Sequence, residues 1–191
     1  IHSARQAKLA IGKAQALGFE RINLDLMHGL PGQTLASGLA DLQQALDFGT
    51  DHLSWYQLTI EPNTEFHSRP PNLPDEEVLV DIQDQGQGLI EAAGLSQYEI
   101  SAYSKPANQA RHNLNYWRFG DYIGVGAGAH GKVSYWQSGS MVIERRVKLP
   151  QPKAYMSAIN ALSSSHIVTP EELQLEFFMN ALRPPAGVST D

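Results

Sequence analysis

The sequence predicts an α/β fold in which parallel strands are joined by helices. Two observations carry this prediction: the first sixty residues alternate helical and strand patterns, and the links between them are short. Two parallel neighbouring strands cannot be joined by a tight turn, and a helix supplies the crossover that they need. The pattern therefore favours consecutive βα units over an antiparallel sheet.

Both predicted helices of this region have clear ends. Residues 3–17 place apolar side chains on one helical face, with Ser3 available as the N-cap and Gly18 as the stop. Residues 35–49 repeat leucine at three- and four-residue spacing, and Thr34 stands at the N-cap position. Each helix is therefore expected to cover a sheet with its apolar face.

The stretch between these helices, residues 21–34 (RINLDLMHGLPGQT), predicts a buried strand that carries one acid, Asp25, and ends in a turn. A barrel strand delivers ligand-binding side chains at its C-terminal end in this way. An ordinary strand whose acid pairs locally fits the same residues. A second apolar strand is expected at residues 52–60.

The rest of the chain predicts shorter elements separated by loops. We expect a proline-rich loop at 61–74, a helix from Asp75 to about Ala93, a strand at 97–101, an irregular polar and aromatic segment at 103–118, a strand, glycine-rich turn and second strand at 121–136, a strand at 141–149, a helix at 153–162 and a helix capped by Thr169. Three or four parallel strands are too few to close an eight-stranded barrel. We therefore expect further residues before Ile1 and after Asp191.

The composition argues against several classes of protein. With a formal net charge of -6 and no basic stripe, the 191-residue chain is not expected to bind nucleic acid. No apolar run approaches the roughly 18 residues of a transmembrane segment, and the first residues show no signal-peptide pattern, so we expect a cytoplasmic protein. The chain has no cysteine, so it supplies no disulfide, no thiolate zinc site and no cysteine ligand to an iron-sulfur cluster.

Three glycines, Gly126, Gly128 and Gly131, match the GxGxxG spacing of dinucleotide-binding loops. Such a loop must open a helix whose N-terminus meets phosphate, whereas residues 132–137 (KVSYWQ) alternate like a strand. The glycines are therefore interpreted as a turn that lets the backbone approach a flat ligand closely.

A second cluster combines a ligand-competent side chain with stacking side chains. Residues 112–117 (HNLNYW) place the imidazole of His112 close to an aromatic pair. Such a group can ligate haem iron or stack on a tetrapyrrole, and a surface loop with half-buried aromatic anchors fits equally well. His28 and His130 each follow an apparent strand and are expected to face one strand-end mouth, but dispersed histidines make a weak zinc site.

Five segments follow one another along the chain: NLDLMHGLPGQT, HLSWYQLTIEPNT, QYEISAYSKP, HNLNYW and GDYIGVGAGAHG. Together they resemble the C-terminal half of the radical-SAM haem chaperones, relatives of oxygen-independent coproporphyrinogen III oxidase. The resemblance covers nearly all of residues 1–180. It implies the C-terminal strands of a partial (β/α)6 radical-SAM barrel, a TIM-like architecture, followed by a C-terminal β/α extension.

The same resemblance implies an organisation in three parts. Residues 1–106 are expected to form the last βα units of the barrel. Residues 107–165 are expected to hold the HNxxYW motif, the glycine-rich loop and a β-hairpin. Residues 166–191 are expected to form a helix and a linker into a further C-terminal domain.

The resemblance also implies ligands and site residues. The expected cofactors are S-adenosylmethionine (SAM), a [4Fe-4S] cluster and haem. The expected contacts are Asp25 with the SAM ribose, Thr59, His130, Gly126 and Gly128 on the adenine side, and His112, Tyr116 and Trp117 with haem. The cluster cysteines belong to the N-terminal half of the family, so this chain is expected to hold no cluster ligand and no catalytic residue of its own.

Three functions remain open from the sequence. The first is part of a chaperone that binds haem and passes it to acceptor haemoproteins, supported by SAM, the cluster and the missing N-terminal half. The second is a coproporphyrinogen III oxidase of porphyrin biosynthesis, and the third is a scaffold fragment without a ligand. In none of them is this chain expected to be active alone.

Overall fold

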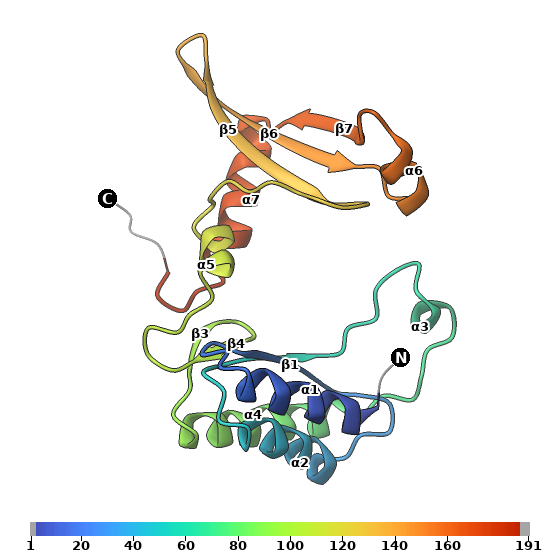
Figure 1. The fold of residues 1–191 in the computed structure, drawn as a ribbon, viewed down its shortest axis with the longest axis vertical. Helices are drawn as coiled ribbons and strands as arrows, with labels where there is room; N and C mark the ends of the chain where they lie inside the picture. The colour runs from blue at the N-terminus through green and yellow to red at the C-terminus, as the bar shows by residue number, and fades with distance from the viewer. Residues whose placement is uncertain (1–2, 188–191) are drawn as a thin grey trace. The chain divides into compact units, whose positions relative to one another are not determined.

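The computed structural model describes residues 3–187 of the chain. The chain divides into two compact units, the first ending at Gln109 and the second beginning at Ala110. Figure 1 shows the ribbon with its helices and strands labelled. Each unit has its own sheet, and the two units are described in turn.

The first unit alternates helices and strands as the sequence predicts. Its elements are α1 (Ala4–Ala16), β1 (Asn23–His28), α2 (Leu35–Leu46), β2 (His52–Gln57), α3 (Glu65–Ser68), α4 (Glu76–Ala92), β3 (Ser96–Glu99) and β4 (Ala102–Ser104). The segment 61–74, which the sequence predicts to be a loop, contains the short helix α3. Capping by Thr64 accounts for the start of this helix. The second strand ends three residues before its expected end at Ile60.

Side-chain capping explains where two of the helices begin. The side chains of Ser3 and Thr34 each accept a hydrogen bond from the backbone N–H three residues further on. The side chain of that third residue in turn accepts a hydrogen bond from the backbone N–H of the capping residue. Asp75 stands at the N-cap of α4 without such a bond. That helix therefore lacks a contribution that is typically about 1 kcal/mol.

The sheet of the first unit is mixed and has the strand order β1-β2-β4-β3. Strands β1 and β2 are parallel, with Asn23 opposite His52 and His28 opposite Gln57. Strand β4 pairs antiparallel with both β2 and β3, so β3 runs in the same direction as β1 and β2 without pairing with either strand. Three strands therefore run in one direction, within the predicted three or four, but the turn after Glu99 folds β4 back between β2 and β3 as an antiparallel strand that the sequence does not predict.

The hydrophobic core of this unit lies between the sheet and helices α2 and α4, which cover one face of the sheet in Figure 1. Its buried residues are Leu42, Leu53, Trp55, Ile82, Ile90, Leu95 and Tyr103, with Leu24 and Leu26 packed against them. A Cβ at Gly86 of α4 would lie 2.2 Å from the indole of Trp55. Glycine at this position therefore lets the helix approach the sheet.

The second unit contains an antiparallel sheet of strand order β5-β6-β7. Its elements are α5 (Arg111–Trp117), β5 (His130–Gln137), β6 (Ser140–Lys148), α6 (Pro152–Ser157), β7 (Leu162–Ile167) and α7 (Pro170–Ala181). Helix α5 packs against α7, whose N-cap is the predicted Thr169. Within residues 3–187, none of the helices combines the length and the hydropathy that a membrane crossing needs.

Several local predictions for the second unit are wrong. The segment 103–118 contains helix α5, and the helix expected at 153–162 ends at Ser157. The strand expected after Asp121 is reduced to one bridge between Tyr122 and Lys132. The serine-rich strand β7 forms because β6 offers it a pairing edge, which outweighs the low β-propensity of its sequence.

Candidate functional site

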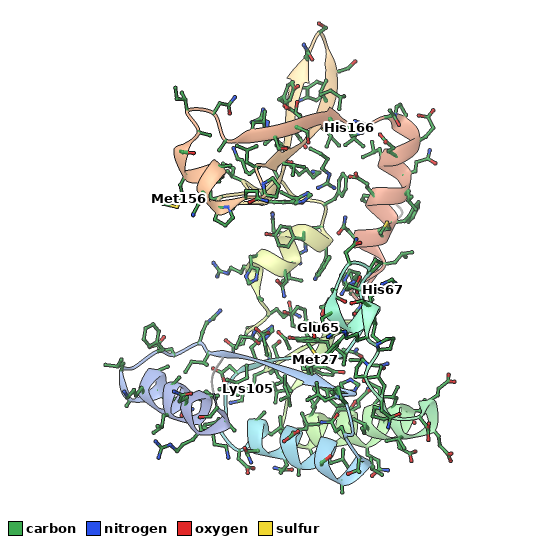
Figure 2. The ribbon with its side chains drawn as sticks, turned by 90° about the vertical axis from the view of Figure 1, so that its right-hand side faces the viewer. Met27, Glu65, His67, Lys105, Met156 and His166 are labelled. Atoms are coloured by element: carbon green, nitrogen blue, oxygen red, sulfur yellow. The ribbon has the colours of Figure 1, made fainter. Side chains whose placement is uncertain are left out.

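The face of the first sheet that α2 and α4 leave uncovered carries polar side chains, and we call it the polar face. It consists of Asn23, Asp25 and Met27 of β1 with His52, Ser54 and Tyr56 of β2. These residues share a face because side chains alternate along a strand, and Leu24, Leu26, Leu53 and Trp55 point the other way into the core. Met27 is labelled on this face in Figure 2.

Asp25 lies in the middle of β1 and is exposed to solvent. The prediction that this acid stands on a strand is confirmed by the strand assignment. Its carboxylate is not isolated, because Nδ2 of Asn23 donates a hydrogen bond to Oδ1 of Asp25 at 3.0 Å. The acid therefore faces solvent with one oxygen already held by a neighbour on its own strand.

Asn23 is in turn held by the adjacent strand. Its Oδ1 lies 2.6 Å from Nδ1 of His52 and accepts a hydrogen bond from Oγ of Ser54 at 3.2 Å. The other ring nitrogen of His52, Nε2, lies 2.6 Å from the hydroxyl oxygen of Tyr98 on β3. A continuous set of hydrogen bonds thus runs from Tyr98 through His52 and Asn23 to Asp25.

Sequence reasoning singled out Asp25 but missed Asn23, His52 and Tyr98. One signal was present, because Asn23 and Asp25 share the odd positions of β1 while polar residues recur at every second position of β2. A polar face on two neighbouring strands indicates a surface that the helices do not cover. The contribution of Tyr98 had no such signal, since it depends on the unforeseen β3-β4 turn.

Thr59 follows β2 and is exposed, and its hydroxyl donates a hydrogen bond to Glu61 at 2.9 Å. It belongs to the same unit as Asp25, as the sequence analysis expects for two residues of one nucleoside site. The remaining candidates, including His112 and His130, belong to the second unit. Of the expected SAM contacts, Asp25 and Thr59 therefore belong to the first unit.

His28 ends β1 but does not face the strand-end mouth, so that expectation is wrong. Its side chain is buried, and its ring packs on Trp55 with the ring centroids 4.5 Å apart. Burial lowers the pKa of His28 below 6.5, while the nearby Gln83 side chain acts in the opposite direction. The imidazole is thus a neutral core group, because the register of β1 turns position 28 toward the helices.

The glycine-rich loop of the second unit is a tight turn, as predicted. Gly126 and Gly128 have φ values of 114° and 70°, and the backbone N–H of Gly126 donates to the hydroxyl of Tyr155. A Cβ at Gly124 would lie 2.2 Å from the carbonyl oxygen of His130. Strand β5 begins at His130 instead of a helix, so the loop has no helix N-terminus for a dinucleotide phosphate.

The HNxxYW segment lies on helix α5. His112 is exposed, and its ring meets that of Tyr116 edge to face with centroids 6.5 Å apart. Tyr116 also meets Tyr122 edge to face at 4.6 Å. Trp117 is half-buried, and among residues 3–187 its indole nitrogen finds no hydrogen-bond partner although that atom is buried.

A cavity of about 280 Å³ adjoins this helix. It is lined by aromatic rings and by two cations, and the lining residues are Tyr116, Trp117, Phe119, Gly120, Tyr122, Lys132, Arg145 and Asn180. Both cations are paired, Lys132 with Asp121 and Arg145 with Glu176. His112 does not line this cavity, but its aromatic lining suits the edge of a flat ring system better than a free phosphate.

The grouping of potential metal ligands is described for residues 3–187. Among the residues that the structure describes, no three or more His, Asp or Glu side chains are grouped so as to hold a metal ion. The sequence contains no cysteine. The ligands of an iron-sulfur cluster therefore do not come from this chain.

No protein-family model matches the chain. Its architecture, however, matches that of a solved enzyme. The structure titled "Coproporphyrinogen III oxidase (HemN) from Escherichia coli is a Radical SAM enzyme" superposes with a TM-score of 0.74, over 96% of this chain and 45% of that chain. Its sequence identity is 17%. The chain therefore has the fold of part of a radical-SAM protein.

Curated proteins give a second, sequence-based comparison. The chain is 53% identical to the heme chaperone HemW of Escherichia coli over 183 residues, which are 96% of this chain and 47% of that protein. It is 34% identical to HemW of Bacillus subtilis over 99% of its own length and 50% of the relative. A mitochondrial radical S-adenosyl methionine domain-containing protein 1 of Bos taurus is 33% identical over 98% of this chain and 44% of that protein.

The chain is therefore similar, over almost its whole length, to about half of each of these heme chaperones. It spans about half the length of the curated relatives that it matches. The resemblance stated from the five sequence segments is confirmed by these relatives, and the radical-SAM fold class is confirmed by the solved structure.

Proposed function

We propose that the chain is part of a radical-SAM haem chaperone that binds haem and delivers it to acceptor haemoproteins. The observation that carries this proposal is the placement of Asp25, whose carboxylate is exposed on the polar face and held there by Asn23. A pair of ribose hydroxyls requires an accessible acceptor, and an exposed carboxylate held in one orientation supplies it.

In this proposal Asp25 accepts hydrogen bonds from the ribose hydroxyls of SAM. Thr59 contacts the adenine through its backbone. The glycine loop of the second unit, with Gly126, Gly128 and His130, is likewise proposed to contact adenine. The positive φ values of the two glycines leave their backbone open to a flat base. Together with a [4Fe-4S] cluster whose ligands lie outside this chain, SAM supplies radical chemistry when it is bound.

Haem is assigned to the second unit. His112 is the axial-ligand candidate because its imidazole is exposed, and Tyr116 meets its ring and in turn contacts Trp117. The aromatic cavity next to α5 suits the macrocycle edge. The buried indole nitrogen of Trp117 adds a donor that the described residues leave unused, which a propionate oxygen would satisfy.

An oxidase that converts coproporphyrinogen III is the second candidate, since the matching structure is such an enzyme. The chaperone is favoured because the identity to proteins named heme chaperones reaches 53%, against 17% to the oxidase. A protein that takes up haem stoichiometrically without converting coproporphyrinogen would support the chaperone. Turnover of coproporphyrinogen would reverse the order of the two candidates.

Replacing His112 by alanine tests the haem assignment. We expect His112→Ala to weaken haem binding by at least about ten-fold, because an axial imidazole bond is lost. The measurement is a titration with haem, followed at the Soret band, of the full-length protein that contains this chain (the intact protein). His67→Ala is the matched control, since His67 is an exposed histidine of α3 in the first unit, labelled in Figure 2, and its removal should leave the spectrum unchanged. Equal haem affinities of the wild type, His112→Ala and His67→Ala would rule out His112 as a haem ligand.

A further inference from the structure

We propose that Asn23, oriented by His52 and Tyr98, is a positioning residue that fixes the carboxylate of Asp25. The proposal rests on the proposed function in one respect, because the ligand for which the carboxylate is positioned is the SAM ribose. The hydrogen bonds themselves do not depend on any ligand. They join three strands, since Asn23 is on β1, His52 on β2 and Tyr98 on β3.

The chemistry of the groups fixes the direction of the hydrogen bonds that Asn23 makes. An ionised carboxylate only accepts, so the amide nitrogen of Asn23 must face Asp25 and its oxygen must face His52. The amide oxygen also only accepts, so Nδ1 of His52 must carry the hydrogen. In the neutral imidazole Nε2 is then an acceptor, and it receives the hydroxyl hydrogen of Tyr98.

Burial decides which end of the set is the anchor. His52 and Tyr98 are 6% and 7% exposed, and their hydrogen bonds are both 2.6 Å long. Asn23 and Asp25 are exposed. A rigid, buried pair thus holds the amide, and the amide holds an acid that would otherwise rotate freely in water.

Such an arrangement lowers the cost of binding. A side chain that is already in its bound orientation loses less conformational entropy when the ligand arrives. Because Oδ1 of Asp25 is occupied by Asn23, the free lone pairs of both oxygens keep a fixed direction. Asn23 does not touch the ligand in this account and acts only through Asp25.

Two ligand-independent measurements test the positioning. In the intact protein labelled with ¹⁵N-histidine, we expect His52 to show a protonated Nδ1 and an unprotonated Nε2. The couplings about the Cα–Cβ bond of Asp25 should report a single rotamer in the wild type and an average of rotamers in Asn23→Ala. An unprotonated Nδ1 at His52 or an unchanged Asp25 rotamer in Asn23→Ala would overturn the proposal.

Binding of SAM to the intact protein provides the functional arm. We expect about ten-fold weaker binding in Asn23→Ala and in His52→Leu, since each loses a hydrogen bond that orients a charged group. His52→Gln should restore most of the affinity, because its amide can donate to Asn23 and accept from Tyr98. Asn108→Ala, a control asparagine outside the network, should bind like the wild type.

The two arms separate two kinds of failure. If the wild type does not bind SAM but shows the expected tautomer and rotamer, the proposed function fails and the positioning of Asp25 stands. If SAM binds and Asn23→Ala binds it as tightly as the wild type, the positioning role for that ligand is wrong. Failure of His52→Gln to recover affinity, with the fold intact by circular dichroism, would also contradict the network.

Discussion

Replacing Gly86 by alanine will destabilise the first unit by about 2–3 kcal/mol. The added Cβ would lie 2.2 Å and 2.8 Å from two indole carbons of Trp55, and 3.0 Å from a methyl of Leu42. Trp55 and Leu42 are 2% and 0% exposed, so neither can move without opening the core. The penalty outweighs the roughly 0.5–1 kcal/mol that alanine gains over glycine within a helix.

Gly88 of the same helix is the matched control. No atom lies within 4 Å of a Cβ built there, so Gly88→Ala should stabilise α4 by about 0.5–1 kcal/mol. Hydrogen exchange of α4 amides at increasing urea measures the local free energy of unfolding for both variants. If Gly86→Ala were as stable as Gly88→Ala, the close packing of α4 on Trp55 would be contradicted.

Removing Asp121 will cost the second unit about 3–5 kcal/mol, because it leaves the ammonium of Lys132 buried without its counter-ion. The Lys132 side chain is 3% exposed and its Nζ lies 3.0 Å from Oδ1 of Asp121. That Nζ also donates to the carbonyl of Phe119 at 2.8 Å and lies over its ring. Those contacts remain in Asp121→Ala, but none of them carries a negative charge.

The reverse replacement is expected to be much milder. Lys132→Met leaves a carboxylate that is 42% exposed and still bonded to Ser134, so no buried charge is stranded. The double variant Asp121→Ala with Lys132→Met should recover stability relative to Asp121→Ala alone. Hydrogen exchange of β5 measures the effects, and equal losses in the two single variants would contradict the asymmetry.

The same pair predicts a dependence of stability on pH. Burial alone would raise the pKa of Asp121, but hydrogen bonds from Ser134 and Lys132 together hold it below 3.8. A lowered carboxyl pKa stabilises the folded state fully above the pKa of the unfolded chain. This stabilisation is therefore lost as pH falls below about 3.8 toward the folded pKa, and Lys132→Met should lose less of it.

The sequence predicts the local parts of the first unit well because their signals are local. Helix caps such as Ser3 and Thr34 and the leucine spacing of α2 need no information from elsewhere in the chain. The position of β4 is different, since it depends on pairing Ala102–Ser104 with β2, about fifty residues earlier. Three residues carry too weak a pattern to reveal such a partner.

The second unit illustrates the limits of apolar patterns. Ile123 and Val125 predict a buried strand, yet they are 83% and 81% exposed because only one bridge forms beside them. Helix α5 has Ala110 at its N-cap, which makes no side-chain capping bond. The sequence therefore offers neither a capping residue nor a periodic pattern from which this helix could be predicted. The candidate site could likewise be predicted only in part. Asp25 could be recognised from β1 alone, whereas His52 and Tyr98 join its hydrogen-bond network only when the sheet has formed.

Calorimetric titration of SAM into the intact protein with its iron-sulfur cluster tests the central claim most directly. Asp25→Ala should weaken binding roughly 10- to 100-fold, the loss expected for hydrogen bonds to a charged acceptor. Asp81→Ala, which removes an exposed acid from α4, should bind SAM like the wild type. Equal affinities of Asp25→Ala and the wild type would contradict the assignment of the polar face to the SAM ribose.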